Sequence, residues 1–175
     1  MTRVHPPLRW SGLVLLAAAL LSCAPTAIGA EDAVVRHVID GDTIELSDGR
    51  LVRYIGLDTP ELRRRARPGD REWRAGVGDG WVEDPEPFGR EAKEANRRLV
   101  EGRSLRLEYD AQTHDRYGRW LAYVFVDGRM VNAALLEDGY AQLLTIPPNV
   151  KYAQQLRRAA REAREARRGL WGALK

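Results

Sequence analysis

The sequence predicts a small β-barrel with attached helices, an α+β protein of one domain. The chain has 175 residues and is 44% hydrophobic, which is enough for one globular domain with a real core. Five short β-type segments fall within residues 33–126. Strands so short and so closely spaced are typical of a small barrel rather than of a parallel sheet with crossover helices.

The first 30 residues have the pattern of an export leader. Arg3 and Arg9 are not balanced by any acid, and an uninterrupted apolar run follows at Leu13–Leu21. Nine apolar residues are too few to span a bilayer, which needs about 20, but they suit the central region of a secretory signal. We therefore expect a bacterial protein that is exported from the cytoplasm, with residues 31–175 forming the folded domain.

The sequence of this leader is compatible with two alternative cleavage sites. The string Leu20–Cys23 resembles a bacterial lipobox, in which Cys23 becomes a lipidated N-terminus and tethers the protein to the membrane. The residues Ile28, Gly29 and Ala30 instead look like an ordinary small-residue peptidase site, which predicts a freely secreted or periplasmic protein.

The composition excludes several classes of site. With one Cys and three His, the chain has neither an internal disulfide nor a Cys/His zinc cluster, so oxygen atoms would have to hold any metal. Because residues 1–30 contain two Arg and no acid, residues 31–175 carry 26 basic against 25 acidic side chains. Bulk charge therefore cannot attract a polyanion to this domain, and only local basic patches can, such as those at 63–74 and 151–168.

The strands are predicted from β-branched and apolar runs separated by turn signals. Asp48-Gly49 separates two such runs and indicates a two-residue hairpin, and Asp127-Gly128 closes another. The five predicted strands are Ala33–Ile39, Thr43–Leu46, Leu51–Leu57, Leu105–Tyr109 and Trp120–Val126.

Three helices follow from apolar residues at helical spacing. The first covers Phe88–Leu99 and stops before Gly102, and the second begins at Val131 and stops before Gly139. The third covers Tyr152–Ala163, and its Arg/Glu face is typical of a solvated helix surface. Between residues 62 and 87 no periodicity is present, and the sequence predicts a long surface loop rich in arginine.

Two short acidic strings carry the first chemical signal. They are Asp40-Gly-Asp42-Thr43 and Asp58-Thr59-Pro60-Glu61. The first string alone indicates no more than a turn. If the Asp48-Gly49 hairpin forms, however, Asp42 and Asp58 reach the same rim, where two carboxylates require a cation between them. Hard oxygen ligands favour Ca²⁺ or Mg²⁺.

Arginines carry the second signal. In the predicted strand, Arg53 shares parity with Leu51, Ile55 and Leu57, so its guanidinium lies along an apolar face and needs an anion. That anion is either a structural carboxylate or a bound phosphate, which an arginine fork grips bidentately. Arg119 follows a turn and, taken alone, predicts a solvated loop side chain.

Several strings in register resemble the thermonuclease family, the staphylococcal-nuclease-like enzymes. They are VIDGDT (38–43), VRYIGLDTPE (52–61), FGREA (88–92), DRYGRWLAYVFVDGRMVNAALLEDGYA (115–141) and GLW (169–171). The resemblance runs from Val34 to Trp171. It implies a five-stranded OB-fold barrel with three α-helices. It also implies a Ca²⁺-dependent phosphodiesterase that cuts DNA and RNA to products with 3′-phosphates. We expect a monomer, and the sequence implies no protein partner.

The resemblance also implies metal ligands. Asp42 and Asp58 match the family's calcium carboxylates, and Thr59 matches the residue that offers its backbone carbonyl. Asp40 matches an outer-sphere carboxylate behind these ligands.

The same match implies the catalytic groups. Glu61 corresponds to the carboxylate that orients or deprotonates the attacking water, and Arg53 and Arg119 correspond to the two arginines on the scissile phosphate. Tyr117 and Arg116 would lie near that phosphate and help to bind the substrate.

The chain departs from the family at two places. Residues 142–149 lack the tyrosines on which a nucleotide base stacks, and Tyr152, Trp73 and Trp81 are the candidates to replace them. The 62–87 loop is longer than in the staphylococcal enzyme, and it either lies over the substrate backbone or is a disordered insertion.

Two further hypotheses compete with a nuclease. One is a nucleic-acid-binding OB module with weak or lost catalysis, which predicts missing acids or arginines, although all five are present. The other is an oligosaccharide or protein binder of OB type, which leaves the pair Arg53 and Arg119 unexplained.

Overall fold

The computed structural model describes residue 1 and residues 29–65, 67, 81–84 and 86–173. The predicted leader with Cys23, and Trp73 in the predicted long loop, lie outside the described residues. Within the described part of the chain, no helix has the length and apolar character needed to cross a bilayer.

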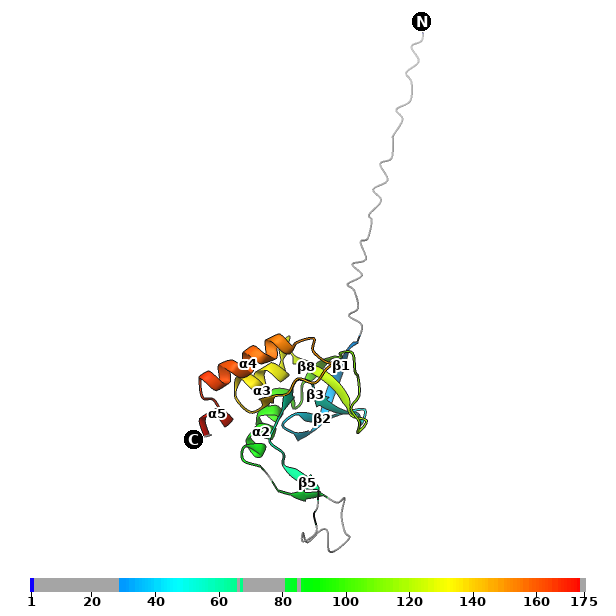
Figure 1. The fold of residues 1–175 in the computed structure, drawn as a ribbon. Helices are drawn as coiled ribbons and strands as arrows, with labels where there is room; N and C mark the ends of the chain where they lie inside the picture. Colours follow the sequence, from blue (N-terminus) through cyan, green and yellow to red (C-terminus); the bar gives the residue numbers. More distant parts are fainter. Residues whose placement is uncertain (2–28, 66, 68–80, 85, 174–175) are drawn as a thin grey trace.

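Five strands form a closed barrel, as predicted (Figure 1). They are β1 (Ala30–Asp40), β2 (Thr43–Leu46), β3 (Leu51–Tyr54), β7 (Ser104–Glu108) and β8 (Trp120–Val126). Their order is β3-β2-β1-β7-β8, and a parallel pairing between β3 and β8 closes the barrel. The long β1 makes this closure possible because its first half pairs with β7 and its second half with β2. The predicted α+β OB-fold is confirmed.

The predicted strand Leu51–Leu57 is wrong in its second half. β3 ends at Tyr54, a turn follows at Ile55-Gly56, and β4 (Leu57–Asp58) leaves the barrel to pair with β10 (Gln142–Leu143). Gly56 has φ +87°, and a Cβ there would lie 2.2 Å from Cδ1 of Leu156. Only glycine accepts both the left-handed backbone and this close approach.

The break after Tyr54 also changes which face of β3 is buried. Val52 and Tyr54 point into the core and are almost fully buried, whereas Leu51 is 40% exposed. The parity argument that placed Arg53 on an apolar face is therefore wrong, because the residues on either side of the turn do not share one alternation.

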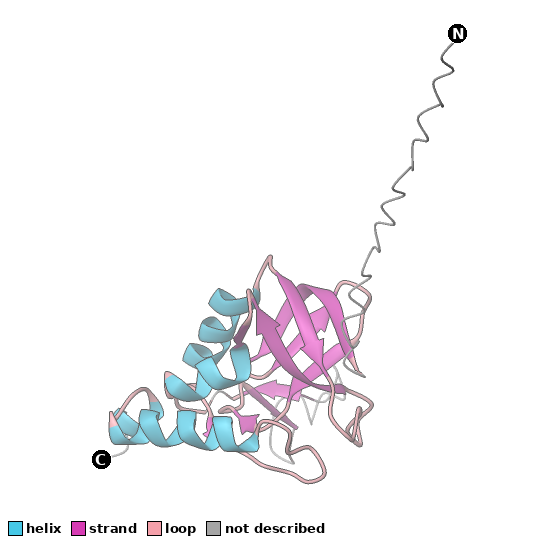
Figure 2. Ribbon diagram, turned by 90° about the horizontal axis from the view of Figure 1, so that it is seen from above, coloured by secondary structure: helices cyan, strands magenta, loops and turns pink. Residues whose placement is uncertain are grey.

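The helices gather on one side of the barrel (Figure 2). The predicted three are α2 (Gly89–Val100), α3 (Val131–Glu137) and α4 (Ala153–Glu165), and a single turn, α5 (Leu170–Ala173), follows them. α4 packs on α3, and α2 packs on β1 and α3. The side chain of Asn132 in α3 donates to Ile55 O at 2.9 Å and accepts from Val124 N at 2.8 Å, so this buried amide fixes the turn after β3.

Part of the predicted 62–87 loop is regular structure. β5 (Arg63–Arg65) and β6 (Trp81–Glu83) pair as an antiparallel ribbon that projects from the barrel near α2 (Figure 1). β9 (Arg129–Met130) extends the edge of the main sheet beside β8. The ribbon was not predicted because each strand has only three residues and β5 consists of arginine alone, so no alternation is visible.

Candidate active site

The acidic strings meet at one rim of the barrel. Asp42, in the turn between β1 and β2, is 5% exposed, and its Oδ2 accepts hydrogen bonds from the backbone N and the Oγ1 of Thr59, both at 3.0 Å. The close approach requires Gly41, because a Cβ there would lie 2.7 Å from Oγ1 of Thr59. The hairpin thus carries Asp42 to the start of the segment that holds Asp58 and Glu61.

Arg53 joins the two aspartates. Its Nη1 lies 3.0 Å from Oδ2 of Asp42, and its Nη2 lies 2.6 Å from Oδ1 of Asp58. Nη1 also donates to the carbonyl oxygens of Leu57 at 3.0 Å and Tyr54 at 3.2 Å. The carboxylate partner left open by the sequence is therefore present, and these contacts fix the guanidinium in one position.

Glu61 lies in an environment that favours its protonated form. Burial and the charges of Asp40, Asp42 and Asp58 raise the pKa of Glu61 to about 7, and Asp40 is hydrogen-bonded to it. Burial and the charge of Asp42 likewise raise the pKa of Asp40. Burial raises the pKa of Asp58 although Arg53 opposes it. The rim therefore holds more negative charge than one arginine balances.

Asn96 is a site residue that the sequence analysis missed. This amide of α2 is fully buried, donates to Asp40 O at 3.1 Å, and accepts from the hydroxyl of Tyr54 at 2.9 Å. It thereby ties the acidic turn to the end of β3. In the sequence, Asn96 stands next to the apolar stripe formed by Ala92 and Ala95. A polar side chain at such a buried position needs hydrogen-bond partners, and this need could have indicated a structural role.

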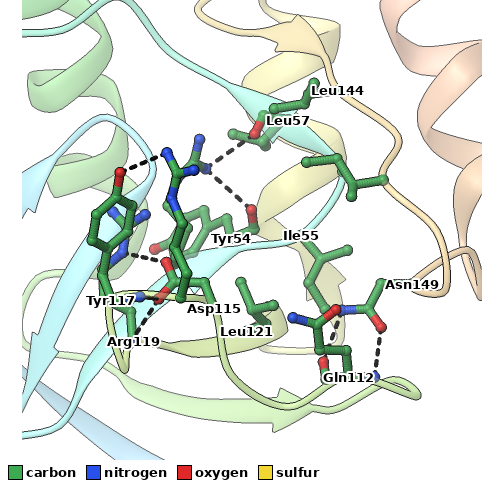
Figure 3. A pocket seen from close by; sticks show the side chains of 14 residues that line it. Tyr54, Ile55, Leu57, Gln112, Asp115, Tyr117, Arg119, Leu121, Leu144 and Asn149 are labelled. Carbon is green, nitrogen blue, oxygen red and sulfur yellow. Dashed lines mark hydrogen bonds and ion pairs between the residues drawn. The ribbon is translucent and has the colours of Figure 1, made fainter.

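A cavity of about 510 Å³ lies next to the acidic rim and shares Arg53 with it; Figure 3 shows the side chains that line the cavity. Arg53 and Arg119 both line it, and Arg53 thus belongs to the cavity and to the acidic cluster. Arg119 is not the solvated side chain predicted from its loop position: it is 29% exposed, and its Nε donates to Asp115 Oδ2 at 2.7 Å. Tyr117 is 69% exposed, and its hydroxyl accepts from Nη2 of Arg116 at 2.7 Å.

The opposite wall of the cavity is aliphatic. Leu144 and Ile146 line it and are partly exposed. Asn149 supports this wall, because its side chain exchanges two hydrogen bonds of 2.8 Å with the backbone of Gln112. Figure 3 shows Leu144 and Asn149 across the cavity from Tyr117.

Tyr152 does not replace the missing stacking tyrosines. Its ring packs edge-on against Tyr123, with centroids 4.8 Å apart, and its hydroxyl donates to Glu108 at 2.7 Å. Tyr152 is not among the described residues that line the cavity. The side chains of Trp73 and Trp81 lie outside the described residues.

The chemistry of the rim fits a hard divalent cation. Four carboxylates converge there, and the pKa of three of them is raised, so a further positive charge would stabilise the ionised cluster. Among the residues that the structure describes, however, no three acidic, histidine or cysteine side chains form a ready-made metal cage. Asp42 and Asp58 instead form ion pairs with Arg53.

Comparison with known proteins agrees with this geometry. A family model described as staphylococcal nuclease homologue matches residues 51–173. The thermonuclease of Staphylococcus hyicus is 36% identical over 140 residues, which cover 78% of this chain and 73% of that protein. The thermonuclease of Staphylococcus intermedius is 34% identical over 149 residues, or 83% of this chain and 79% of that protein. The SPbeta prophage-derived endonuclease YokF of Bacillus subtilis is 34% identical over 145 residues, or 80% of this chain and 44% of that protein.

The barrel, the rim and these relatives define the class of the protein, a hydrolase of the nuclease type built on an OB-fold. The chain belongs to the staphylococcal nuclease homologue family. The expected family and enzyme class are thereby confirmed.

Proposed function

We propose that this protein is an exported, Ca²⁺-dependent nuclease that hydrolyses DNA and RNA and leaves 3′-phosphate ends. One observation carries the proposal. Arg53 bridges Asp42 and Asp58 and also lines the cavity that Arg119 lines, so an acidic rim suited to a cation adjoins two arginines suited to a phosphate.

Asp42, Asp58 and the carbonyl of Thr59 are the groups we assign to Ca²⁺, with Asp40 in the outer sphere. The ion supplies Lewis-acid stabilisation of charge on the phosphate oxygens when it is bound. Asp42 is preoriented for this role by its two hydrogen bonds from Thr59.

Glu61 is the group we assign to the attacking water. A carboxylate at this position, beside Asp40 and the two assigned calcium ligands, can orient a water molecule and accept its proton. The water gives a proton to Glu61 and its oxygen bonds to phosphorus as the bond to the 5′-oxygen breaks. The 5′-oxygen takes a proton from solvent, and the phosphate stays on the 3′ side.

Arg53 and Arg119 are the groups we assign to the scissile phosphate. Because the Nε of Arg119 is already held by Asp115, little side-chain entropy is lost when its terminal nitrogens bind the phosphate. Preorganised donors of this kind contribute about 10²–10³ each in rate. Arg116 and Tyr117 lie on the same loop and would contact the neighbouring part of the substrate.

Removal of calcium tests the metal assignment. Cleavage of plasmid DNA and of single-stranded RNA by the purified protein should fall to background in a calcium chelator and return when Ca²⁺ is restored in excess. The cleaved ends should resist polymerase extension until a phosphatase removes the 3′-phosphate. Full activity in the chelator would contradict the calcium assignment. Binding without cleavage under every divalent metal would favour the nucleic-acid-binding module.

Lipidation of Cys23 is the tethered form of the export proposal, and the lipobox-like string Leu20–Cys23 supports it. Cells that express the full chain should incorporate labelled fatty acid into it, and Cys23→Ala should abolish the label and release the protein from the membrane fraction. Ser22→Ala is the matched control and should retain the label. If the unsubstituted chain is exported without any label, the ordinary cleavage site applies and the tether is excluded.

A further inference from the structure

Asp115 stabilises the tight turn of the loop that carries Arg119. Its Oδ1 accepts from the backbone N of Tyr117 at 2.8 Å and from the backbone N of Arg119 at 3.0 Å. Its own N donates to Arg119 O at 3.0 Å, and its carbonyl accepts from Gly118 N at 3.1 Å. An aspartate that binds backbone amides two and four residues ahead fixes a tight turn.

The second oxygen of the same carboxylate reaches the side chain. Oδ2 of Asp115 accepts a charge-assisted hydrogen bond from Nε of Arg119 at 2.7 Å. The side chain of Asp115 is only 16% exposed. Within the described residues, Nη1 and Nη2 of Arg119 have no hydrogen-bond partner, and Arg119 lines the cavity. Figure 3 shows the paired Asp115 and Arg119 beside Tyr117.

Holding Arg119 through Nε alone has an energetic consequence, because the side chain is long and flexible. Arginine loses about 1.5–2 kcal/mol of rotamer entropy when it is fixed in one conformation. A bond at Nε fixes the plane of the guanidinium and leaves the two terminal nitrogens, the pair that grips two oxygens of a phosphate, available for a ligand.

We infer that Asp115 is a positioning residue for nucleic-acid hydrolysis, which holds Arg119 through Nε so that its terminal nitrogens face a phosphate in the cavity. This inference rests on the proposed role of Arg119. Asp115 also lines the cavity, but both of its carboxylate oxygens accept hydrogen bonds from its own loop, so it acts by limiting the conformations of Arg119.

Asp115→Asn is the primary test. The asparagine keeps an oxygen for the backbone amides but presents an amide group in place of the second oxygen, so the bond to Nε is lost. We expect kcat on DNA to fall by about 10- to 100-fold, the usual effect of losing a group that orients an active-site residue. KM should change by less than about threefold, since the arginine acts mainly in the transition state. Asp115→Ser keeps a shorter acceptor for the turn and should show the same loss.

Asp48→Asn is the matched control. Asp48 holds Arg50 with the same pattern, in which Oδ1 accepts from the backbone N at 3.0 Å and Oδ2 accepts from Nε at 2.7 Å. The cavity lining does not include Arg50 within the described chain. Loss of this pair, whose aspartate is more exposed than Asp115, should leave kcat unchanged.

Arg119→Ala separates failure of the inference from failure of the proposed function. If Arg119→Ala keeps full activity, the proposed role of Arg119 is wrong. If Arg119→Ala is inactive while Asp115→Asn matches Asp48→Asn in kcat, the role of Arg119 stands and the positioning inference is overturned. In the Arg119→Ala background, Asp115→Asn should cause no further loss of the residual rate, because both changes remove one interaction. An additive loss would show that Asp115 acts through the fold and would also overturn the inference.

Discussion

Glu61→Gln should lower kcat by about 10²–10⁴, the contribution of a positioned general base. Glutamine keeps the size and the hydrogen-bonding reach of the side chain but cannot take a proton. The structure places Glu61 for that task, because its carboxyl group lies beside Asp40, Asp42 and Asp58 at the rim. Single-turnover cleavage of an end-labelled oligonucleotide at saturating enzyme measures this effect directly.

Binding should survive the same substitution. The affinity for an uncleavable phosphorothioate oligonucleotide should change by less than about threefold, because Glu61→Gln removes negative charge and no phosphate-binding group. Glu94→Gln is the control, since Glu94 pairs with Arg97 on the surface of α2. An unchanged single-turnover rate in Glu61→Gln would remove Glu61 from the mechanism.

Arg53→Gln should have two opposite effects. The value of kcat/KM should fall by about 10²–10³, because a preorganised cation beside the phosphate is lost. Calcium should bind more tightly, because Arg53 no longer competes for Asp42 and Asp58, which it contacts at 3.0 and 2.6 Å. Titration calorimetry with Ca²⁺ and steady-state cleavage measure the two effects on one sample.

Arg36→Gln is the matched control for Arg53→Gln. Arg36 forms an exposed pair with Glu45 at 3.3 Å on the barrel surface, and its loss should change neither activity nor calcium affinity. In the absence of Ca²⁺, Arg53→Gln should also lower the stability by about 3–5 kcal/mol, because Asp42 becomes a buried charge without its partner. Weaker calcium binding in Arg53→Gln would contradict the assignment of these aspartates as ligands.

Local patterns predicted much of the barrel. β2 and β8 have the predicted bounds, Thr43–Leu46 and Trp120–Val126, because apolar runs that end at Asp-Gly turns are complete within a few residues of sequence. The end of β3 was not predictable in this way. It depends on Gly56, whose left-handed backbone accommodates Leu156 from α4, a contact between residues 100 positions apart.

The candidate site also contains features that local sequence predicted and features that it did not. The acidic strings and the hairpin between them correctly indicated that Asp42 and Asp58 meet, and Arg53 correctly indicated an anionic partner. The parity argument for Arg53 failed, because it extended one alternation across a turn. Asn96 was missed, because its partners, Asp40 and Tyr54, lie in other elements.

The sequence by itself determined the order of the strands along the chain, the membership in the nuclease family, and the identity of the acids and arginines at the rim. Only the tertiary structure decided how those groups are paired and charged. Arg53 is held between two aspartates, Arg119 is held by Asp115, and the pKa of Glu61 rises to about 7. The physical reason is that residue type and spacing are properties of a short segment, whereas ion pairing and pKa depend on burial and on distances between side chains that the fold brings together.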